Sequence, residues 1–275
     1  MAWNSTPTQT TWVDTLVSAM TDQVTGDRYR YDTLFYKYQR EGALRSARAL
    51  LPHIIGMLRV GTVLDVGCGA GAWLAAYGDL GVSDYMGVDG DYVDRSMLLV
   101  AATKFIPRDI AIPFDLGRQF DLVQCLEVGE HVPTAASATL VDNIVRHGKC
   151  VLFSAAVPGQ GGEDHINEQS YEFWRTLFAQ RCFRLFDFLR PRIQGDDRIE
   201  PWYRCNVLFF AHDDVLAALA PAITLTRVPD EAPIRDFSSA GYRLRKAILR
   251  ALPSKAGSSL AILKHKLVVR SLNRR

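Results

Sequence analysis

Short apolar runs alternate with amphipathic stretches through the middle of this chain. Each run ends at glycine or at a polar residue, which is the pattern of buried strands separated by helices. The predicted strands are residues 62–66, 85–89, 110–114, 121–126, 150–154, 183–188 and 205–211. This order predicts an α/β protein built on a doubly wound sheet.

The regions on either side of this alternation differ from it. Residues 11–58 carry apolar positions at spacings of three and four, which predicts helices. After residue 211 the alternation stops and prolines interrupt the chain. We therefore divide the chain into an N-terminal helical cap over 1–59, a core over 60–212, and a C-terminal linker and basic tail over 213–275.

The composition limits the classes of protein to consider. At 275 residues and 48% hydrophobic content, the chain can bury a full core. No apolar run reaches the roughly 18 residues of a membrane span, and the chain does not begin with a basic segment followed by an apolar one. We therefore expect a cytoplasmic protein. Its five cysteines form no Cys-x-x-Cys pair, which argues against a zinc site or a disulfide framework.

The formal charge of +2 conceals an uneven distribution. Residues 237–275 hold 10 Lys and Arg and no acid, so the rest of the chain holds 22 basic and 30 acidic residues. Leu244, Ile248 and Leu252 recur beside these charges, as in helices that lie on an anionic surface such as the inner membrane. An alternative has the same weight as membrane binding: the helix docks on its own domain or on a second copy in a homodimer, with its charged face solvated. Nucleic acid is a weaker alternative because few aromatic residues accompany the charges.

Gly67, Gly69 and Gly71 follow the first predicted strand at alternate positions, and a helix is expected over residues 71–78. Glycine permits positive φ and removes the Cβ that would keep a ligand from the backbone, while the helix start offers unpaired N–H groups. Asp65, two residues before the first glycine, would repel a pyrophosphate but can accept hydrogen bonds from an ammonium group. The motif therefore predicts a cationic ligand.

Asp89 ends the second predicted strand, where an acid commonly binds ribose hydroxyls. The chain thus contains an acid, one intervening residue, Gly-x-Gly-x-Gly and then this second acid. This pattern resembles the signature of class I S-adenosylmethionine-dependent methyltransferases. Residues 114–116 and 120–133 fall where that family contacts adenine and forms its fourth strand with the following loop. The resemblance covers residues 60–211.

This resemblance implies a Rossmann-like seven-stranded sheet whose last strand is antiparallel, with S-adenosyl-L-methionine (SAM) as cofactor. Helices before the first strand often cover the cofactor in this family, so Gln39 and Arg45 are candidates to bind its methionine carboxylate. For Arg45 the alternative is a solvent-exposed salt bridge. The remaining cofactor residues that the resemblance implies are Asp65, Gly67, Cys68, Gly69, Gly71, Asp89, Gly90, Asp115, Leu116 and Glu127.

Glu127, Glu130 and His131 are spaced so that one helical turn would gather them at the carboxyl end of the fourth strand, where the acceptor should bind. His165 lies in a polar loop after the fifth strand. The Glu-x-x-Glu-His pattern with a later histidine resembles the metal site of methyltransferases that modify RNA 3′ ends, and the loop of quinone-biosynthesis O-methyltransferases. It implies Mg²⁺ or Mn²⁺ bound by all four residues. In the metal-free alternative His131 or His165 is the general base, Glu130 helps to orient the loop and Glu127 lies beneath the cofactor.

The acceptor is suggested by residues 190–206, which resemble bacterial methyltransferases encoded among glycosyltransferases. We therefore expect O-methylation of a sugar or of a cell-surface glycan precursor. Trp174, Trp202 and Tyr203 could stack on a sugar ring, although such aromatic residues are more often core. The alternatives are a small aromatic or quinone-like metabolite, an RNA 2′-hydroxyl, and a non-catalytic protein that binds the cofactor as a partner of other enzymes.

Overall fold

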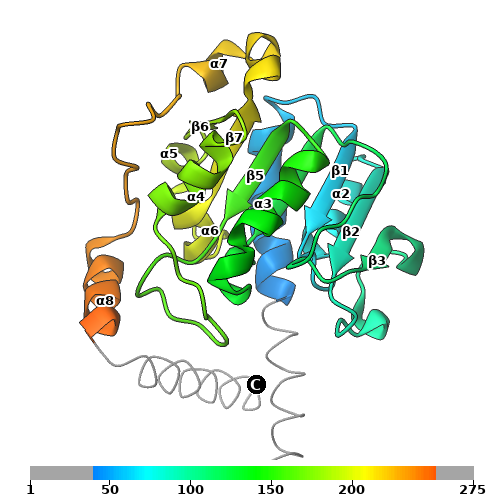
Figure 1. Cartoon of the computed structure of the whole chain (residues 1–275), viewed down its shortest axis with the longest axis horizontal. Coiled ribbons are helices and arrows are strands. Elements are labelled where there is room, and N and C mark those ends of the chain that lie inside the picture. Colours follow the sequence, from blue (N-terminus) through cyan, green and yellow to red (C-terminus); the bar gives the residue numbers. More distant parts are fainter. Residues whose placement is uncertain (1–39, 252–275) are drawn as a thin grey trace, which may run out of the picture. The chain divides into compact units, whose positions relative to one another are not determined.

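The computed structural model describes residues 40–251. Its centre is a seven-stranded sheet in the order β3-β2-β1-β4-β5-β7-β6 (Figure 1). The strands are β1 (Thr62–Val66), β2 (Asp84–Asp89), β3 (Phe105–Pro107), β4 (Leu122–Leu126), β5 (Cys150–Ser154), β6 (Phe183–Phe186) and β7 (Leu208–His212). The first five strands run parallel, and β7 pairs antiparallel with both β5 and β6. The predicted Rossmann-like sheet with an antiparallel last strand is confirmed.

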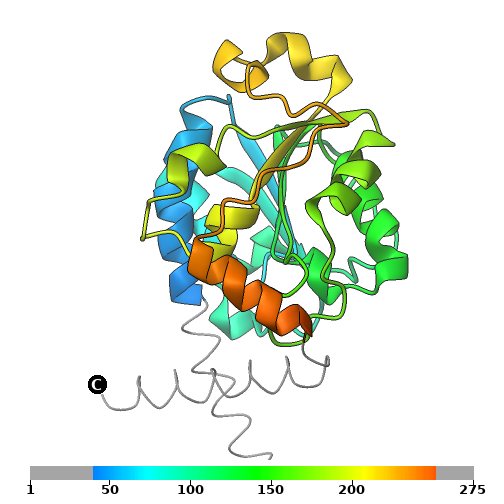
Figure 2. The same cartoon turned by 90° about the vertical axis from the view of Figure 1, so that its left-hand side faces the viewer.

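Helices cover both faces of this sheet, which Figure 2 shows edge-on. One face is covered by the helix over residues 40–55 and by α2 (Ala72–Asp79), and the other by α3 (Ser137–Arg146) and α4 (Tyr171–Ala179). The remaining α-helices are α5 (Arg190–Ile193), α6 (Pro201–Asn206), α7 (Pro221–Thr224) and α8 (Ala240–Ala251). Single 3₁₀ segments span Arg95–Met97, Ala102–Lys104, Gly129–His131, Thr134–Ala136 and Asp213–Ala218.

Two hydrophobic cores follow from the alternation of side chains along each strand. In β1, Val63 packs under the helix over 40–55 and α2, while its neighbour Leu64 packs under α3 and α4. Leu152 and Phe153 divide between the two cores in the same way in β5. Because central strands are buried on both faces, they read as continuous apolar runs, and this made them predictable.

Two predicted strands are corrected by the structure. The third strand is Phe105–Pro107 rather than 110–114, because β2 offers a partner of only three residues, Gly87 to Asp89. Ile110 and Phe114 are buried, but in a loop. The last strand begins at Leu208 rather than at 205, since the proline-initiated helix α6 occupies the preceding residues.

Gln39, expected to bind the cofactor, and the basic tail beyond residue 251 lie outside the described residues. Within that part, no helix is both long and apolar enough to cross a membrane. The first turns of the basic tail form α8, which makes hydrogen bonds to the loop that follows β5. Part of the surface of α8 therefore rests on its own domain.

Candidate functional site

The glycine loop after β1 has the backbone that its sequence predicted. Gly67, Gly69 and Gly71 have φ values of 81°, 51° and 76°, all in the left-handed region. A Cβ on Gly67 would lie 2.4 Å from a Val128 methyl group, whereas a Cβ on Gly69 would meet nothing within 4 Å. Gly67 therefore allows close packing, and Gly69 leaves open space beside the backbone. Gly71 caps α2 without a side-chain hydrogen bond, which leaves the first N–H groups of the helix for a ligand.

Asp65 lies beneath this loop and is only 2% exposed. Burial raises the pKa of its carboxyl to about 7; contact with Gln124 opposes this shift and the charge of Asp89 adds to it. A buried carboxylate without a counter-charge is costly, so an ammonium group beside it would be favoured. Cys68, also buried, packs against Gly87 of β2, and burial raises the pKa of its thiol, so it has the properties of a packing residue.

Asp89 joins the end of β2 to the glycine loop. Its Oδ2 accepts a hydrogen bond from the Gly69 N–H at 2.7 Å, and its Oδ1 accepts one from the Gly90 N–H at 2.7 Å. The Tyr92 hydroxyl also donates to Oδ1, at 2.6 Å. The sequence predicted the position of this acid but not its tyrosine partner, which lies three residues further along the same turn.

The loop around Asp115 and Leu116 is held by two polar residues of α3. The Leu116 N–H donates to His147 Nε2 at 2.9 Å, and the Asn143 side chain binds the Phe114 N–H at 3.0 Å. Asp115 itself is exposed and accepts from the Gly117 N–H. Sequence analysis missed Asn143 and His147, although two fully buried polar residues one helical turn apart would have been a signal.

Glu127 is held in place by amide side chains. Its Oε2 accepts from Gln160 Nε2 at 2.9 Å and its Oε1 from Asn206 Nδ2 at 3.2 Å. Its backbone adopts a φ of 55°, and its N–H donates to the Ser154 carbonyl at 2.9 Å. Burial raises the pKa of Glu127, and these hydrogen bonds oppose the shift. The carboxylate is therefore oriented before any ligand binds, by partners that the sequence did not indicate.

Glu130, His131 and His165 form a separate cluster in which one potential ligand atom from each residue lies within 4.8 Å of the others. The geometry does not bring Glu127 into this group. Glu130 is 1% exposed, and neither of its carboxylate oxygens has a side-chain hydrogen-bond partner among the described residues, although the backbone at Glu130 and Ala156 acts to lower its pKa. Burial raises the pKa of Glu130 well above its ordinary value, and the charge of Glu127 adds to this.

Each imidazole of the cluster is held by a hydrogen bond at its Nδ1 atom. His131 Nδ1 lies 3.2 Å from the Asp164 carbonyl oxygen, and His165 Nδ1 lies 2.9 Å from Glu168 Oε1. Because these oxygens accept, each Nδ1 is the donor, and in the neutral form of either ring Nε2 keeps its lone pair. Burial, followed by the charge of His165, lowers the pKa of His131, which favours the neutral ring. Such bracing is typical of histidines that bind a metal ion or take up a proton.

Backbone hydrogen bonds bring the two histidine-bearing segments together. The Glu130 carbonyl accepts from the N–H groups of Ile166 and Asn167, at 2.9 and 3.0 Å. Asn167 Nδ2 also donates to the Gly129 carbonyl at 3.0 Å, and Glu168 accepts from the N–H groups of Gly159 and Gly161. The two loops that the sequence placed at the acceptor are therefore joined directly.

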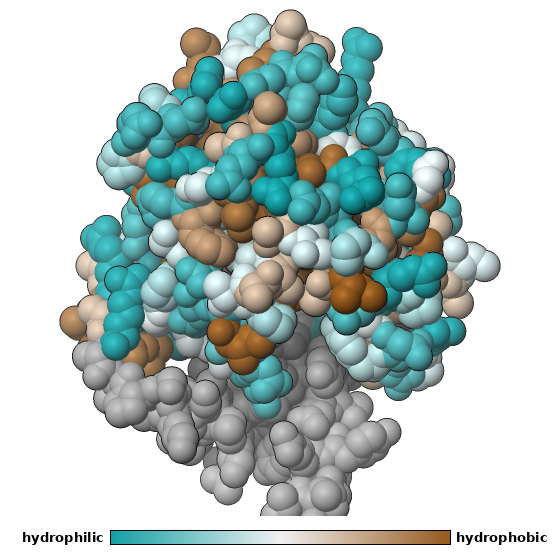
Figure 3. Space-filling view, in the orientation of Figure 1, coloured by the Kyte–Doolittle hydropathy of each residue, from teal (hydrophilic) through white to brown (hydrophobic). Residues whose placement is uncertain are grey.

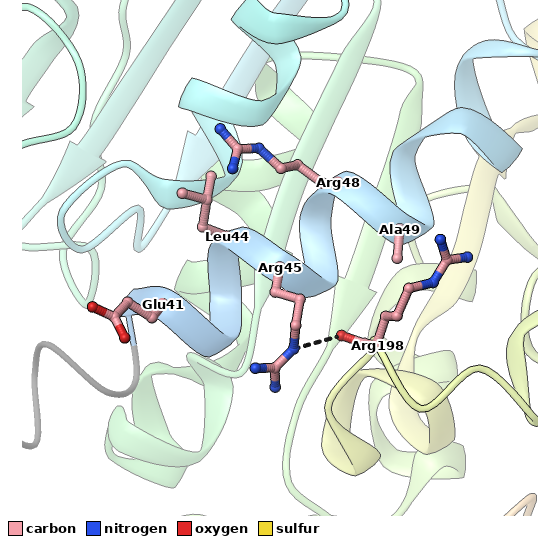
Figure 4. Close-up of a pocket in the computed structure, with 6 residues that line it drawn as sticks. All are labelled: Glu41, Leu44, Arg45, Arg48, Ala49 and Arg198. Atoms are coloured by element: carbon pink, nitrogen blue, oxygen red, sulfur yellow. Dashed lines mark hydrogen bonds between the residues drawn. The ribbon is translucent and has the colours of Figure 1, made fainter. Parts of the chain in front are cut away.

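A shallow pocket of about 380 Å³ lies elsewhere, on the outer side of the helix over residues 40–55 (Figure 4). Arg45, expected near the methionine carboxylate, lines this pocket, forms an ion pair with Glu200 and donates to the Arg198 carbonyl. The salt bridge, noted as the alternative, is what the structure contains. Arg48 and Arg198 also line the pocket, and each forms an ion pair with an aspartate. Each described arginine that lines the pocket is therefore paired with an acidic residue.

Comparison with known proteins identifies the class to which this fold and site belong. Residues 36–187, just over half of the chain, match the family model described as Methyltransferase domain, and the chain belongs to this family. The chain therefore contains a methyltransferase domain. The glycine loop, Asp65 and Asp89 lie where the family signature requires them.

Individual relatives match over parts of the chain. A stretch of 86 residues is 36% identical to the ubiquinone biosynthesis O-methyltransferase of Pseudomonas paraeruginosa, covering 28% of this chain and 35% of that protein. The chain thus spans about a third of the length of that curated relative. Among solved structures, magnesium protoporphyrin IX methyltransferase from Synechocystis PCC 6803 with bound SAM matches with a TM-score of 0.46 and 16% identity, covering 62% of this chain and 80% of that one. A sugar N-methyltransferase from Streptoalloteichus matches with a TM-score of 0.45 and 18% identity, covering 77% and 98%.

Proposed function

We propose that this enzyme transfers the methyl group of SAM to a hydroxyl of a sugar in a bacterial glycan precursor, with a divalent metal ion bound by Glu130, His131 and His165. The observation that carries the metal site is the Glu130 carboxylate, which is buried and has no side-chain partner in the described part of the chain. Buried carboxylates are normally paired or bound to a metal ion. Two imidazoles with free Nε2 atoms beside it complete a plausible set of ligands.

The side chains that meet in the cluster narrow the expected metal site in two respects, its residues and its metal ion. Both oxygens of Glu127 already accept hydrogen bonds from amides, so we assign this residue to orientation of the site and not to the metal. Two imidazoles and one carboxylate suit Mn²⁺ better than Mg²⁺, which prefers oxygen ligands. When bound, such an ion would lower the pKa of an acceptor hydroxyl. Without a metal ion, the same imidazoles are the candidates for general base.

The sugar acceptor is supported by the resemblance of residues 190–206 and by Trp202, which is half-buried at the start of α6. The other two aromatic candidates are core residues. Trp174 is 2% exposed and packs against Phe153, and Tyr203 packs edge-on against Trp73. A second acceptor class, a small quinone-like aromatic metabolite, is favoured by the name of the curated relative that is 36% identical over 86 residues.

Transfer of label from methyl-labelled SAM tests this function. The enzyme is incubated with a bacterial extract, in chelator and after addition of Mn²⁺, and the extract is then fractionated. The proposal predicts label in glycan or lipid-linked glycan, loss of label in chelator and recovery with Mn²⁺. Glu130→Gln should abolish this recovery, while Glu231→Gln, at an exposed carboxylate outside the site, should leave it intact.

Each other outcome contradicts part of the proposal. Label in small metabolites supports the quinone-like acceptor, and label in RNA supports 2′-hydroxyl methylation. Full activity in chelator eliminates the metal ion and leaves His131 and His165 as bases. Measured SAM binding without any label in the extract favours the non-catalytic binding protein.

A further inference from the structure

The helix α8 buries one of its basic side chains and hydrogen-bonds two exposed ones to its own domain. Lys246 is 4% exposed, and its Nζ donates to Asp236 at 2.8 Å and to Ser238 at 2.9 Å. Arg245 donates to the Gln160 carbonyl at 2.9 Å, and Arg250 donates to the Pro158 carbonyl at 2.6 Å. Three of the four basic residues of α8 are therefore bound to the protein.

Aliphatic side chains occupy the outer side of the same helix. Leu244 is 64% exposed and Ile248 is 54% exposed, and a spacing of four residues places them on one side of the helix. Arg243, beside Leu244, is also exposed. A surface helix normally buries its apolar side, so an exposed aliphatic pair beside a buried lysine departs from the usual pattern. Small apolar patches elsewhere are separated by hydrophilic surface on the face seen in Figure 3.

Helix α8 packs on the loop that carries His165. A Cβ on Gly159 would lie 2.4 Å from the Lys246 carbonyl oxygen, so the two backbones are in close contact. Figures 1 and 2 show α8 and this loop at the same end of the domain. Ile166, in the same loop, is 64% exposed. A surface that bound the outer side of α8 would therefore lie next to the acceptor site.

The charge of this region determines the kind of partner. Residues 237–275 carry 10 Lys and Arg and no acid, and six of the basic residues follow α8 directly in the sequence. Each basic residue near an anionic lipid surface strengthens binding about fivefold. A second copy docked on the same stripe would bring two such basic segments together, which like-charge repulsion opposes. Glu163 and Asp164 are exposed acids on the neighbouring loop, but the basic residues of 237–275 outnumber them.

We infer that the stripe formed by Leu244, Ile248 and Arg243, named here the outer stripe, docks on an anionic lipid surface. The two aliphatic side chains enter the headgroup boundary and the surrounding basic residues bind the charged lipids. The acceptor loop then faces the membrane. Lipid docking is argued from the exposed side of α8 and the charge of residues 237–275, while its consequence, a lipid-linked sugar as acceptor, rests on the proposed function.

Co-sedimentation of the full chain with vesicles tests this inference. We expect binding to phosphatidylglycerol/phosphatidylcholine vesicles, at least tenfold weaker binding to phosphatidylcholine alone, and a decrease with salt. The double variant Leu244→Asp/Ile248→Asp should bind the anionic vesicles at least tenfold more weakly. Leu225→Asp is the matched control, because Leu225 is 86% exposed and follows α7, at the other end of the domain from α8. This control should bind like the wild type.

The inference is overturned if the wild type does not bind anionic vesicles, or if the double variant and Leu225→Asp bind equally. It is also overturned if the double variant instead converts a dimer into a monomer in sedimentation velocity, which would make a second copy the occupant. Thermal unfolding and SAM binding of each variant show that the domain is intact. Because vesicle binding needs no acceptor, absence of labelled glycan would count against the proposed function alone.

Discussion

The Tyr92 hydroxyl donates a hydrogen bond to Asp89 Oδ1 at 2.6 Å, although Tyr92 is 83% exposed. Its ring covers Gly90 so closely that a Cβ there would lie 2.1 Å from the ring. Asp89 is the acid assigned to the ribose of SAM, and ribose hydroxyls bind by donating to such a carboxylate. A ribose bound to Asp89, as the family resemblance implies, would compete with the tyrosine hydroxyl for this carboxylate.

This competition predicts that Tyr92→Phe binds the cofactor more tightly. The variant keeps the ring but removes the competing donor, so the affinity for S-adenosylhomocysteine should rise roughly three- to tenfold, within the range of one hydrogen bond to a charged group. Isothermal titration calorimetry measures the change. Weaker binding would mean that the hydroxyl contacts the cofactor instead of competing with it.

Asp89→Ala should weaken SAM binding by roughly 1.5–3 kcal/mol, because the ribose loses a charged acceptor. Equilibrium binding to the variant measures this loss. Asp91→Ala is the matched control, since the Asp91 side chain is 81% exposed and pairs with Arg95 at the surface. Equal affinities of the two variants would contradict the role assigned to Asp89.

Asp65 predicts a dependence of stability on pH. Burial raises the pKa of this carboxyl from 3.8 to about 7 in the folded protein, so the folded state binds its proton more tightly than the unfolded state does. The contribution of Asp65 to stability is therefore fully present below about pH 4 and is lost as the pH rises through about 7, on the order of 1.4 kcal/mol per pKa unit. Urea unfolding at several pH values measures the loss, and Asp65→Asn should reduce it.

The same carboxyl predicts how cofactor binding responds to pH. The ammonium group of SAM favours the ionised form of Asp65, so binding below about pH 7 must release a proton. Affinity should rise between pH 6 and pH 8, and calorimetry in buffers of different ionisation enthalpy should detect the released proton. A flat profile in the wild type would exclude contact between Asp65 and the ammonium group.

Substitutions of Glu130 and of Glu168 should change the stability of the metal-free protein, measured in chelator, in opposite directions. Glu130→Met removes a buried carboxyl that has no side-chain partner in the described chain, and should stabilise the protein by roughly 1–3 kcal/mol. Glu168→Met leaves the N–H groups of Gly159 and Gly161 without their acceptor, and should destabilise it by a similar amount. Thermal unfolding measures both. Mn²⁺ should raise the melting temperature of the wild type but not of Glu130→Met; a loss of stability in Glu130→Met would contradict the account.

The parts of the fold that the sequence predicted are those with local signals. Residues 62–66 and 150–154 are apolar runs buried on both sides, and they form β1 and β5 with the expected bounds. The glycine loop was predictable because left-handed backbone conformations require glycine at Gly67, Gly69 and Gly71. The prediction of the third strand at residues 110–114 was wrong. The strand β3 pairs with β2 over only three residues, which is too short for an alternating pattern to be detected.

The parts of the site that the sequence did not predict depend on contacts between distant residues. Glu127 is bound by Gln160, 33 residues away, and by Asn206, 79 residues away. Glutamines and asparagines have no spacing rule that reveals such partners. The same limit applies to Arg45, whose acid, Glu200, is 155 residues away. Sequence spacing grouped Glu127 with Glu130 on one face, but the positive φ of Glu127 breaks the helical geometry on which that grouping depended.

A crystal structure with S-adenosylhomocysteine and Mn²⁺, measured at the manganese absorption edge, tests the central claim most directly. The account predicts cofactor density along the glycine loop with its ribose on Asp89, and one anomalous peak between Glu130, His131 and His165 facing the cofactor sulfur. Cofactor density at another position, or a manganese peak only outside this cluster, would contradict it.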